Sequence, residues 1–459
     1  MNEKYQMMRI LYLTCFFVCF ISFIPKVAFS SSEDILIVFS GEETGNLEPC
    51  GCYVGQIGGI SRRHTIIDQL KKKNKVIPVS LGDLPSGNER QDEIKMEIFS
   101  HAMRKMGYIL HNVGEKEIEI SPRVLSYLSQ TNNITFLSSN IQINYPFPVI
   151  INKYVINEYV DDKHSFKIAF LGILSKIFSD NILSNGVCVD DPVSALRPLI
   201  KELRNKVDFM VLLSHAPFEE SVEFAKLFPE IGLIITGHGM DEPADTVFYI
   251  NDTPIASPGR SGRFIGIARY SITNKGLKRK SIEVIPLDNK YNDSQEMSLL
   301  LKEYQQILKN EDLLGKTYRE PPPNGLSYVG SSACGICHKI VYEHWSNTTH
   351  GKSYDTLVDT GHQYDPECIK CHTIGFGHIS GFIDYDETQH LINVGCESCH
   401  GAGSLHMNLA NKDYGKTNES GCEICHDSEH SPDFEFKEYW EKIKHPREEV
   451  LKQLPNIVK

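Results

Sequence analysis

Cys334-Gly335-Ile336-Cys337-His338 is one of four copies of a single pattern, in which two cysteines three positions apart are followed at once by a histidine. The other copies are Cys368-Ile-Lys-Cys371-His372, Cys396-Glu-Ser-Cys399-His400 and Cys422-Glu-Ile-Cys425-His426. Two thiols at this spacing can bind the two vinyl groups of one porphyrin, and the adjacent histidine then lies beneath the iron as its proximal ligand. Zinc-ribbon pairs and disulfides are the alternatives, but neither requires a histidine after every pair. The four motifs, numbered 1 to 4 in chain order, therefore predict four covalently bound haem c groups.

The segment that holds the four motifs is short and has few strongly periodic helical stretches. A chain of this length buries too little apolar side-chain surface to form a core of its own, so the porphyrins must supply much of that core. We therefore expect a small, mainly helical, haem-packed multihaem cytochrome domain over residues 327–459. The haems should lie near one another in such a domain, which suits electron transfer.

Charge and cysteine usage narrow the choice of partners. The chain has 459 residues, with 47 Lys+Arg against 59 Asp+Glu, which gives a formal net charge of −12. An acidic balance argues against nucleic acid and favours docking to basic surfaces, which fits redox partner proteins such as other cytochromes or oxidoreductases. Outside the motifs and the N-terminal apolar run, Cys50, Cys52 and Cys188 have no assigned role. A disulfide, inert thiols and a soft-metal or redox site are the alternatives for them.

The first thirty residues have the features of an export signal. Lys4 and Arg9 precede an apolar run over residues 10–24, and Ala28-Phe29-Ser30 offers a small-x-small cleavage site. The run is short for a membrane span and ends at Pro25, although an uncleaved anchor is the alternative. We expect residues 1–30 to be removed and the mature protein to be periplasmic or otherwise exported, with no membrane span.

Residues 31–290 alternate between short apolar runs and amphipathic stretches, which predicts an α/β domain with helices covering its sheets. Strands are expected over residues 35–40, 76–81, 108–113, 134–139, 167–171, 209–214, 233–236 and 265–272, and helices over 60–72, 94–106, 194–205 and 219–227. Polar side chains follow several of these strands, among them Asp83, Glu115, His215 and His238. Asp and His presented from several strand ends are what a dimetal hydrolase needs to hold two cations and an activated water.

The order of these segments resembles that of the calcineurin-like metallophosphoesterases, and in particular their 5'-nucleotidase-like branch. Residues 40–47, Ser-Gly-Glu-Glu-Thr-Gly-Asn-Leu, stand where that branch carries an Asp-x-His-Gly-Asn loop, and residues 58–63 match the Gly-Gly-x-x-Arg-Arg that follows. The later segments follow one another in the same order as in that family: Gly82-Asp83, Asn112-Val-Gly114, His215, Gly237-His238 and Ser257-Pro-Gly259. The resemblance covers residues 35–272 and implies an α+β sandwich.

Five positions depart from the family pattern. Glu42 stands where Asp is expected, Thr44, Lys116 and Met240 stand at histidine positions, and Glu115 replaces a ligand asparagine. Asp83, His215 and His238 remain as candidate ligands of a residual phosphoesterase metal site. The ammonium group of Lys116 would repel a cation, so we expect a retained scaffold that has lost its dimetal centre. A single divalent ion, completed by Glu42 or Glu115, is the alternative.

Residues 291–326 are expected to link the two domains. A helical stretch near residues 296–309 leads to Glu320-Pro321-Pro322-Pro323, and three consecutive prolines form a stiff extended spacer. The 5'-nucleotidase resemblance implies a separate substrate-specificity domain at this point, but no such domain fits the sequence.

From Ser327 to about His445 the chain resembles the tetrahaem cytochrome c-554 family. The matching residues are Tyr328-Val-Gly330, Trp345, Thr349-His350-Gly351, His372-Thr-Ile-Gly375, Val394, residues 396–403, His406, Phe434-Glu-Phe436, Tyr439-Trp440 and Lys442-Ile-Lys-His445. The resemblance implies that one haem lacks a strong distal ligand.

Each haem iron needs a sixth ligand or remains open to a small molecule. His350, His406 and His445 are the best distal candidates, because each lies outside a motif but inside a block that matches the family. The candidates for the fourth iron are His344, His362, His378, His390 and His430. Each of these five can equally be a solvated surface histidine.

Three functions fit the sequence. The first is an exported multihaem electron-transfer protein whose inactive phosphoesterase-like domain docks a partner. The second is a haem oxidoreductase that acts on a small nitrogen or sulfur compound at a five-coordinate iron. The third is an active metal-dependent phosphohydrolase with a haem appendage. The spin state of each haem and the cleavage of phosphate esters distinguish the three.

Overall fold

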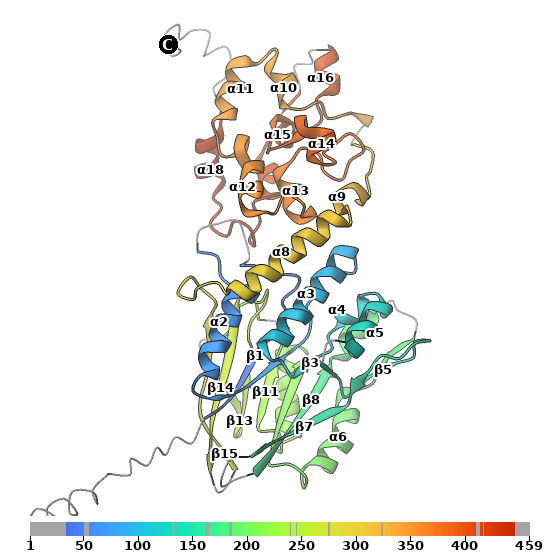
Figure 1. Cartoon of the computed structure of the whole chain (residues 1–459), viewed down its shortest axis with the longest axis vertical. Coiled ribbons are helices and arrows are strands. Elements are labelled where there is room, and N and C mark those ends of the chain that lie inside the picture. The colour runs from blue at the N-terminus through green and yellow to red at the C-terminus, as the bar shows by residue number, and fades with distance from the viewer. Residues whose placement is uncertain are drawn as a thin grey trace, which may run out of the picture.

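The computed structural model describes residues 34–49, 55–131, 134–160, 165–182, 186–238, 240–244, 246–273, 276–322, 325–409, 414–415 and 417–445. The expected export signal, Cys50 and Cys52 lie outside the described residues. The chain forms two halves stacked along its long axis (Figure 1). We call residues 34–316 the sandwich half and residues 317–445 the helical half.

Two sheets pack face to face in the sandwich half. The larger sheet has the order β15 (Gly276–Pro286), β14 (Phe264–Thr273), β1 (Ile35–Ser40), β2 (Lys75–Ser80), β3 (Leu110–Asn112), β4 (Thr135–Leu137) and β6 (Ile151–Asn152). The smaller sheet has the order β12 (Phe248–Ile250), β13 (Thr253–Ala256), β11 (Leu233–Thr236), β10 (Phe209–His215), β8 (Ser165–Leu174) and β7 (Tyr154–Val160). A separate two-stranded antiparallel sheet pairs β5 (Ile141–Ile143) with β9 (Val187–Val189). Apolar side chains of both sheets fill the space between them, among them Phe39, Phe170 and Leu213.

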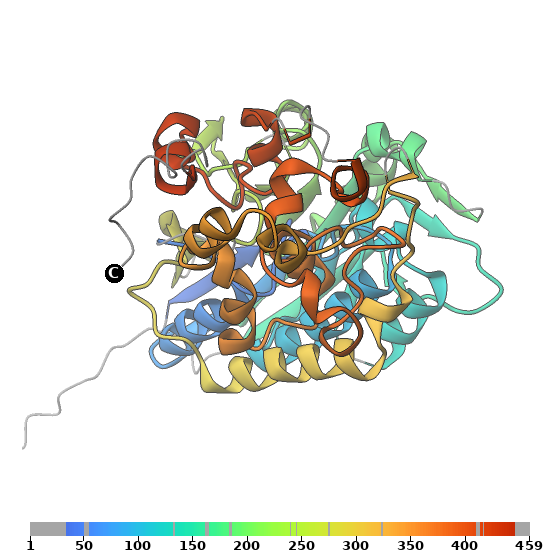
Figure 2. The same cartoon turned by 90° about the horizontal axis from the view of Figure 1, so that it is seen from above.

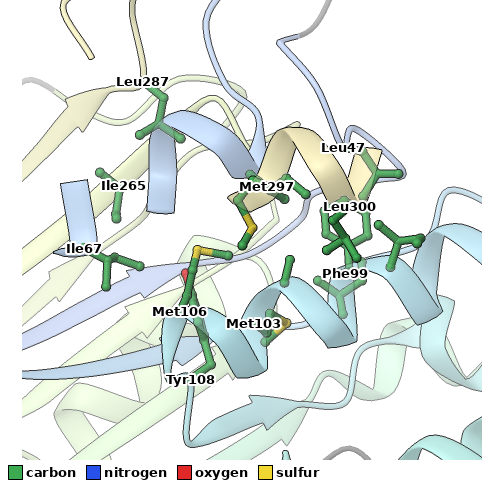
Figure 3. Close-up of a cluster of buried hydrophobic side chains, with 14 of the residues drawn as sticks. Leu47, Ile67, Phe99, Met103, Met106, Tyr108, Ile265, Leu287, Met297 and Leu300 are labelled. Atoms are coloured by element: carbon green, nitrogen blue, oxygen red, sulfur yellow. The ribbon is translucent and has the colours of Figure 1, made fainter. Parts of the chain in front are cut away.

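Helices cover the outer faces of the two sheets. Those packed outside the larger sheet are α2 (Ile60–Lys71), α3 (Arg90–Met106) and α8 (Gln295–Asn310). Those outside the smaller sheet are α6 (Pro192–Leu203) and α7 (Phe218–Leu227). A further cluster is formed by α4 (Glu115–Glu119) and α5 (Pro122–Thr131) with the two-stranded sheet of β5 and β9. Figure 3 shows Phe99, Met103 and Met106 packed near Met297 and Leu300 in the first of these layers. The prediction of an α/β sandwich is confirmed.

Local sequence explains why these elements form where they do. β1 is a continuous apolar run because both of its faces are buried: Leu36 and Val38 lie in the helix-covered core, and Ile37 and Phe39 lie between the sheets. It pairs in parallel with β2 and antiparallel with β14. α3 begins at a reciprocal cap between Glu89 and Asp92 and ends at Gly107, which has a φ of 77°.

α8 joins the two halves rather than standing apart from them. Its buried residues Met297, Leu300, Tyr304 and Leu308 form one helical stripe that packs into the core shared with α2 and α3. The next helix, α9 (Leu313–Lys316), contributes Leu313 to that core and Leu314 to the core of the helical half. Seen from above, the helical half lies over the sandwich, with α8 along one side (Figure 2).

The helical half consists of short helices around a small core. They are α10 (Ser331–Gly335), α11 (Lys339–Ser346), η3 (His350–Lys352), α12 (Ser353–Thr360), α13 (Pro366–His372), α14 (Tyr385–Thr388), η4 (Gln389–Leu391), α15 (Cys396–His400), α16 (Ser404–Leu409), α17 (Glu419–Glu423) and α18 (Phe436–Ile443). Tyr354, Ile369 and Phe382 are central to its buried cluster. The segment before Pro321 is bound to this half, because the backbone of Glu320 exchanges hydrogen bonds with Gly377 and Ile379. Among the described helices, none combines the length and apolarity needed to span a membrane.

Candidate metal and haem sites

Four potential metal ligands converge at one end of the sandwich. Asp83 follows β2, Glu115 opens α4 after β3, His215 ends β10 and His238 follows β11. Each offers one ligand atom, and these atoms all lie within 4.8 Å of one another. The ends of strands from both sheets therefore present two imidazoles and two carboxylates to a common centre.

The geometry of His215 directs its Nε2 atom into this cluster. Its Nδ1 lies 3.0 Å from the carbonyl oxygen of Leu81, which can only accept, so Nδ1 carries the proton. The Nε2 atom lies 2.8 Å from Glu115 and 3.4 Å from Asp83. It also lies 2.7 Å from Nε2 of His238. This orientation by a carbonyl is how metal-bound histidines are commonly held, and the mixed nitrogen and oxygen donors fit one divalent cation.

Burial and close contact shift the pKa values of these groups. Burial raises the pKa of Asp83 to about 6, against the opposing attraction of His215. Burial also acts to raise the pKa of Glu115, but hydrogen bonds from His215 and His238 outweigh it and hold this pKa below its ordinary value. Burial alone would lower the pKa of His215, but the charges of Asp83 and Glu115 and their hydrogen bonds to the ring together outweigh it and raise that pKa. The four side chains are therefore a tightly coupled proton-binding network, whose protons a bound cation would displace.

The backbone around the cluster is strained. Glu42, Thr44, Asp83 and His238 have φ values of 52°, 44°, 57° and 48°, in the left-handed region that non-glycine residues rarely occupy. Gly114 approaches so closely that a Cβ atom there would lie 2.2 Å from Asp83 Oδ1. Strain of this kind is typical of functional sites, where the surrounding fold holds it in place.

Lys116 lies beside the cluster and supports it through its backbone. Its ammonium group lies 3.0 Å from Glu119, and its backbone N–H donates to Asp83 Oδ1 at 3.1 Å. The ammonium group is therefore paired with Glu119, while the backbone of Lys116 orients the candidate ligand Asp83. The Glu42 side chain accepts a hydrogen bond from the backbone N–H of His238 and is not one of the four converging groups.

Two side chains that the sequence analysis did not single out complete the surroundings of the cluster. Glu117 is fully buried and accepts backbone hydrogen bonds from Asp83, Leu84 and Gly114, at 2.8 to 2.9 Å. Phe178 covers one side, with its ring centroid 4.3 Å from that of His238. The sequence offered a signal for Glu117, which is an acidic residue two positions after Glu115, but no local pattern marks Phe178. Met240 lines a separate small pocket with Phe218 and Phe248, away from the cluster.

The four Cys-x-x-Cys-His motifs lie next to one another in an order that differs from their order in the chain. The thiol of Cys334 in motif 1 lies next to that of Cys396 in motif 3. Cys399 in motif 3 lies near Cys422 in motif 4. The thiol of Cys425 in motif 4 lies next to that of Cys371 in motif 2. The spatial order of the motifs is therefore 1, 3, 4, 2.

Three motif histidines face a second histidine across a nearly constant gap. The ring centroids are 6.2 Å apart for His338 and His406, 6.1 Å for His426 and His350, and 6.0 Å for His400 and His445. A metal–imidazole bond is about 2 Å long and the ring centre lies roughly 1 Å further, so imidazoles on opposite faces of one iron have centroids roughly 6 Å apart. The gap of each pair therefore fits a haem iron between two imidazoles.

His372 of motif 2 differs from the other three. Among the described residues, no ring contact joins it to a second histidine. Its Nδ1 donates to the carbonyl of Ser353 at 2.6 Å, as Nδ1 of His400 does to Gly415 at 2.7 Å. Burial lowers the pKa of both histidines, which keeps them neutral with Nε2 available as a ligand.

The five other histidines considered for a fourth iron lie elsewhere. His344 and His390 are exposed. His362 hydrogen-bonds to Glu48 of the sandwich half, His430 donates from Nδ1 to Asp427 at 2.8 Å, and the ring of His378 contacts Tyr328. Cys188 is an exposed free thiol on β9.

Comparison with known proteins relates each half to a different family. Residues 333–401 match the family described as cytochrome c554 and c-prime. Over 91 residues, 17% of this chain, the sequence is 33% identical to cytochrome c-554 of Nitrosomonas europaea, with 39% of that protein covered. Over 271 residues, 50% of this chain, it is 25% identical to the 5'-nucleotidase of Vibrio cholerae, with 48% of that protein covered. The chain thus spans less than half the length of either relative.

Solved structures agree on the fold of the N-terminal part. The 5'-nucleotidase precursor from Thermus thermophilus superimposes with a TM-score of 0.52 and 16% identity, over 72% of this chain and 68% of that one. The calcineurin-like phosphoesterase YfkN from Bacillus subtilis gives 0.50 and 16%, over 60% and 97%. The predicted resemblances are confirmed: the N-terminal part has the calcineurin-like phosphoesterase fold, and a cytochrome c554-type segment follows it.

Proposed function

We propose that this protein is an exported c-type cytochrome that carries electrons through four haems, arranged in the spatial order of motifs 1, 3, 4 and 2. The haems are attached through the motif cysteines Cys334, Cys337, Cys368, Cys371, Cys396, Cys399, Cys422 and Cys425. The proximal ligands are the motif histidines His338, His372, His400 and His426. His406, His445 and His350 are the distal ligands for motifs 1, 3 and 4. When bound, the haems supply one-electron chemistry. The chain orients their axial imidazoles and excludes water around them.

One observation carries this proposal. Three motif histidines each face a second histidine at the spacing that two axial imidazoles require, in a domain that otherwise has only a small apolar core. A pyridine haemochrome assay with intact-mass measurement on properly matured protein should give four haems per chain. Three low-spin haems and one high-spin haem in optical and EPR spectra are expected. Fewer than four haems, or no high-spin signal, would contradict the assignment.

A second function is favoured by the position of His372. An iron held by this residue alone has an open face that could bind a small nitrogen or sulfur compound, which is the haem oxidoreductase hypothesis. The pure electron carrier and the oxidoreductase differ in a direct measurement. Nitrite or hydroxylamine would be turned over at the high-spin haem in the second case and would not be turned over in the first.

The phosphoesterase-like domain is proposed to bind at most one divalent ion, through Asp83, Glu115, His215 and His238, and to hydrolyse phosphate esters negligibly. A two-metal site clamps both the attacking and the leaving oxygen of the phosphoryl group. One set of four ligands cannot hold both ions. Turnover of bis(p-nitrophenyl) phosphate by the full chain with excess manganese tests this, and robust activity that His215→Ala abolishes would favour the phosphohydrolase. If no activity is found, a variant that returns five positions to the family pattern should recover some metal binding. It combines Glu42→Asp, Thr44→His, Glu115→Asn, Lys116→His and Met240→His.

A further inference from the structure

The helix that carries motif 2 is held by side chains of the sandwich half. α13 begins at Asp365, which caps it by accepting from the backbone N–H of Glu367 at 3.0 Å. The two carboxylate oxygens of Asp365 also accept from Gln91 of α3 at 2.8 Å and from the hydroxyl of Tyr304 of α8 at 3.2 Å. The first turn of this helix is therefore fixed by two elements of the other half.

Lys95 of α3 adds a charged contact to the same turn. Its side chain is buried, with 5% of its surface exposed, and its Nζ lies 2.6 Å from Glu367 Oε2. Burial alone would lower the pKa of Lys95, but attraction from Glu367, Asp365 and Asp92 outweighs it and raises that pKa. The ammonium group is therefore charged, and Glu367, which it contacts, immediately precedes Cys368.

The same ammonium group also faces the strained loop beside Asp83. A Cβ atom on Gly45 would lie 3.3 Å from Lys95 Nζ, and Gly45 has a φ of +81°. The backbone N–H of Gly45 donates to Leu84 at 2.7 Å, and that of Thr44 donates to Asp83 at 3.0 Å. Lys95 thus lies between the loop of the candidate metal cluster and the first turn of the motif 2 helix.

We infer that Lys95 is a positioning residue through which the phosphoesterase-like half sets the electrostatic environment of the motif 2 haem. The inference rests on the proposed attachment of a haem at Cys368 and Cys371. It gives the sandwich half a role that requires no hydrolysis: its buried ammonium balances the carboxylate next to the haem attachment site. Gln91 and Tyr304 hold the helix in register for that contact.

The inference predicts shifts of opposite sign for the two partners. Lys95→Met leaves the carboxylate of Glu367 unbalanced, which favours ferric over ferrous haem and lowers the midpoint potential. Glu367→Gln leaves the ammonium of Lys95 unbalanced and raises that potential. A unit charge about 10 Å from the iron changes the ferric-to-ferrous ratio on the order of tenfold at an effective dielectric constant near 20. The half-exposed side chain of Glu367 reduces this to about threefold. The double variant should return close to the wild type.

The test is a potentiometric titration of the full-length holoprotein, followed through the high-spin haem signal. Lys105→Met is the matched control, because Lys105 lies on the same helix and pairs with Glu296 at 2.7 Å on the exposed surface. Opposite shifts for Lys95→Met and Glu367→Gln, cancellation in the double variant and no shift for the control would support the inference. Four haems with an unchanged high-spin potential in both single variants would overturn it, as would an equal shift in Lys105→Met. Fewer than four haems in the wild type would refute the proposed function instead, and the inference with it.

Discussion

His406→Ala should open one additional haem to external ligands. The ring of His406 lies 6.2 Å from that of His338, with 18° between the ring planes. Three of the four motif histidines belong to such a pair, so one haem iron is expected to lack a distal histidine. About one haem per chain should therefore bind carbon monoxide in the wild type. Removing His406 leaves two pairs, and the stoichiometry should rise to about two.

Optical titration of the dithionite-reduced protein with carbon monoxide measures this number directly. The EPR spectrum of the oxidised protein should at the same time change from about one high-spin haem in four to about two in four. His344→Ala is the control, because His344 is exposed in the same half and should leave both numbers unchanged. Unaltered carbon monoxide stoichiometry in His406→Ala would show that another group binds the motif 1 iron and would refute the pairing.

Three other changes test different parts of the molecule. Asp83→Asn removes one of the four converging ligands and should weaken manganese binding by at least about tenfold, measured by isothermal titration with Asp68→Asn on the exposed face of α2 as the control. The hydrogen bond that His362 donates to Glu48 raises the pKa of His362, so this contact between the halves stabilises the protein below the ordinary histidine pKa and is lost as pH rises through the raised value. The melting temperature should therefore fall across that range in the wild type, and a His362→Gln variant that retained the same fall would contradict this account. Leu300→Ala removes a side chain that is 4% exposed in the core between α8 and α3, and should lower the free energy of unfolding by about 2–5 kcal/mol in denaturant titrations.

The elements that could be predicted from the sequence are those whose burial is visible in one short segment. The apolar run of β1 and the amphipathic pattern of α2 gave bounds within one residue of the structure. α3 begins four residues earlier than expected, because the cap formed by Glu89 and Asp92 adds a polar first turn. β15 was not predicted, since its exposed edge position lets Lys278, Arg279 and Lys280 interrupt the apolar alternation.

The sites could be predicted only in part, because the orientation of their side chains depends on the fold. The sequence identifies His350, His406 and His445, but only the fold brings each of them opposite a motif histidine. The spatial order of the motifs depends on contacts between residues far apart in the chain, such as Cys334 and Cys396. The contact of the Lys116 ammonium group with Glu119 likewise could not be predicted from the position of Lys116 in the sequence.

The strained backbone around Asp83 bears on why this half of the molecule is retained beside a cytochrome. Four non-glycine residues in the left-handed region each cost on the order of 1–3 kcal/mol, and such strain persists only where the surrounding structure over-determines it. Here the backbone of Thr44 and Gly45 hydrogen-bonds to the segment that carries the candidate ligand Asp83, and Gly45 also faces Lys95, whose ammonium group contacts the motif 2 helix. Under the proposal that this half hydrolyses phosphate esters negligibly, the contact of Lys95 with the motif 2 helix gives the neighbouring loop a role that requires no phosphoryl transfer.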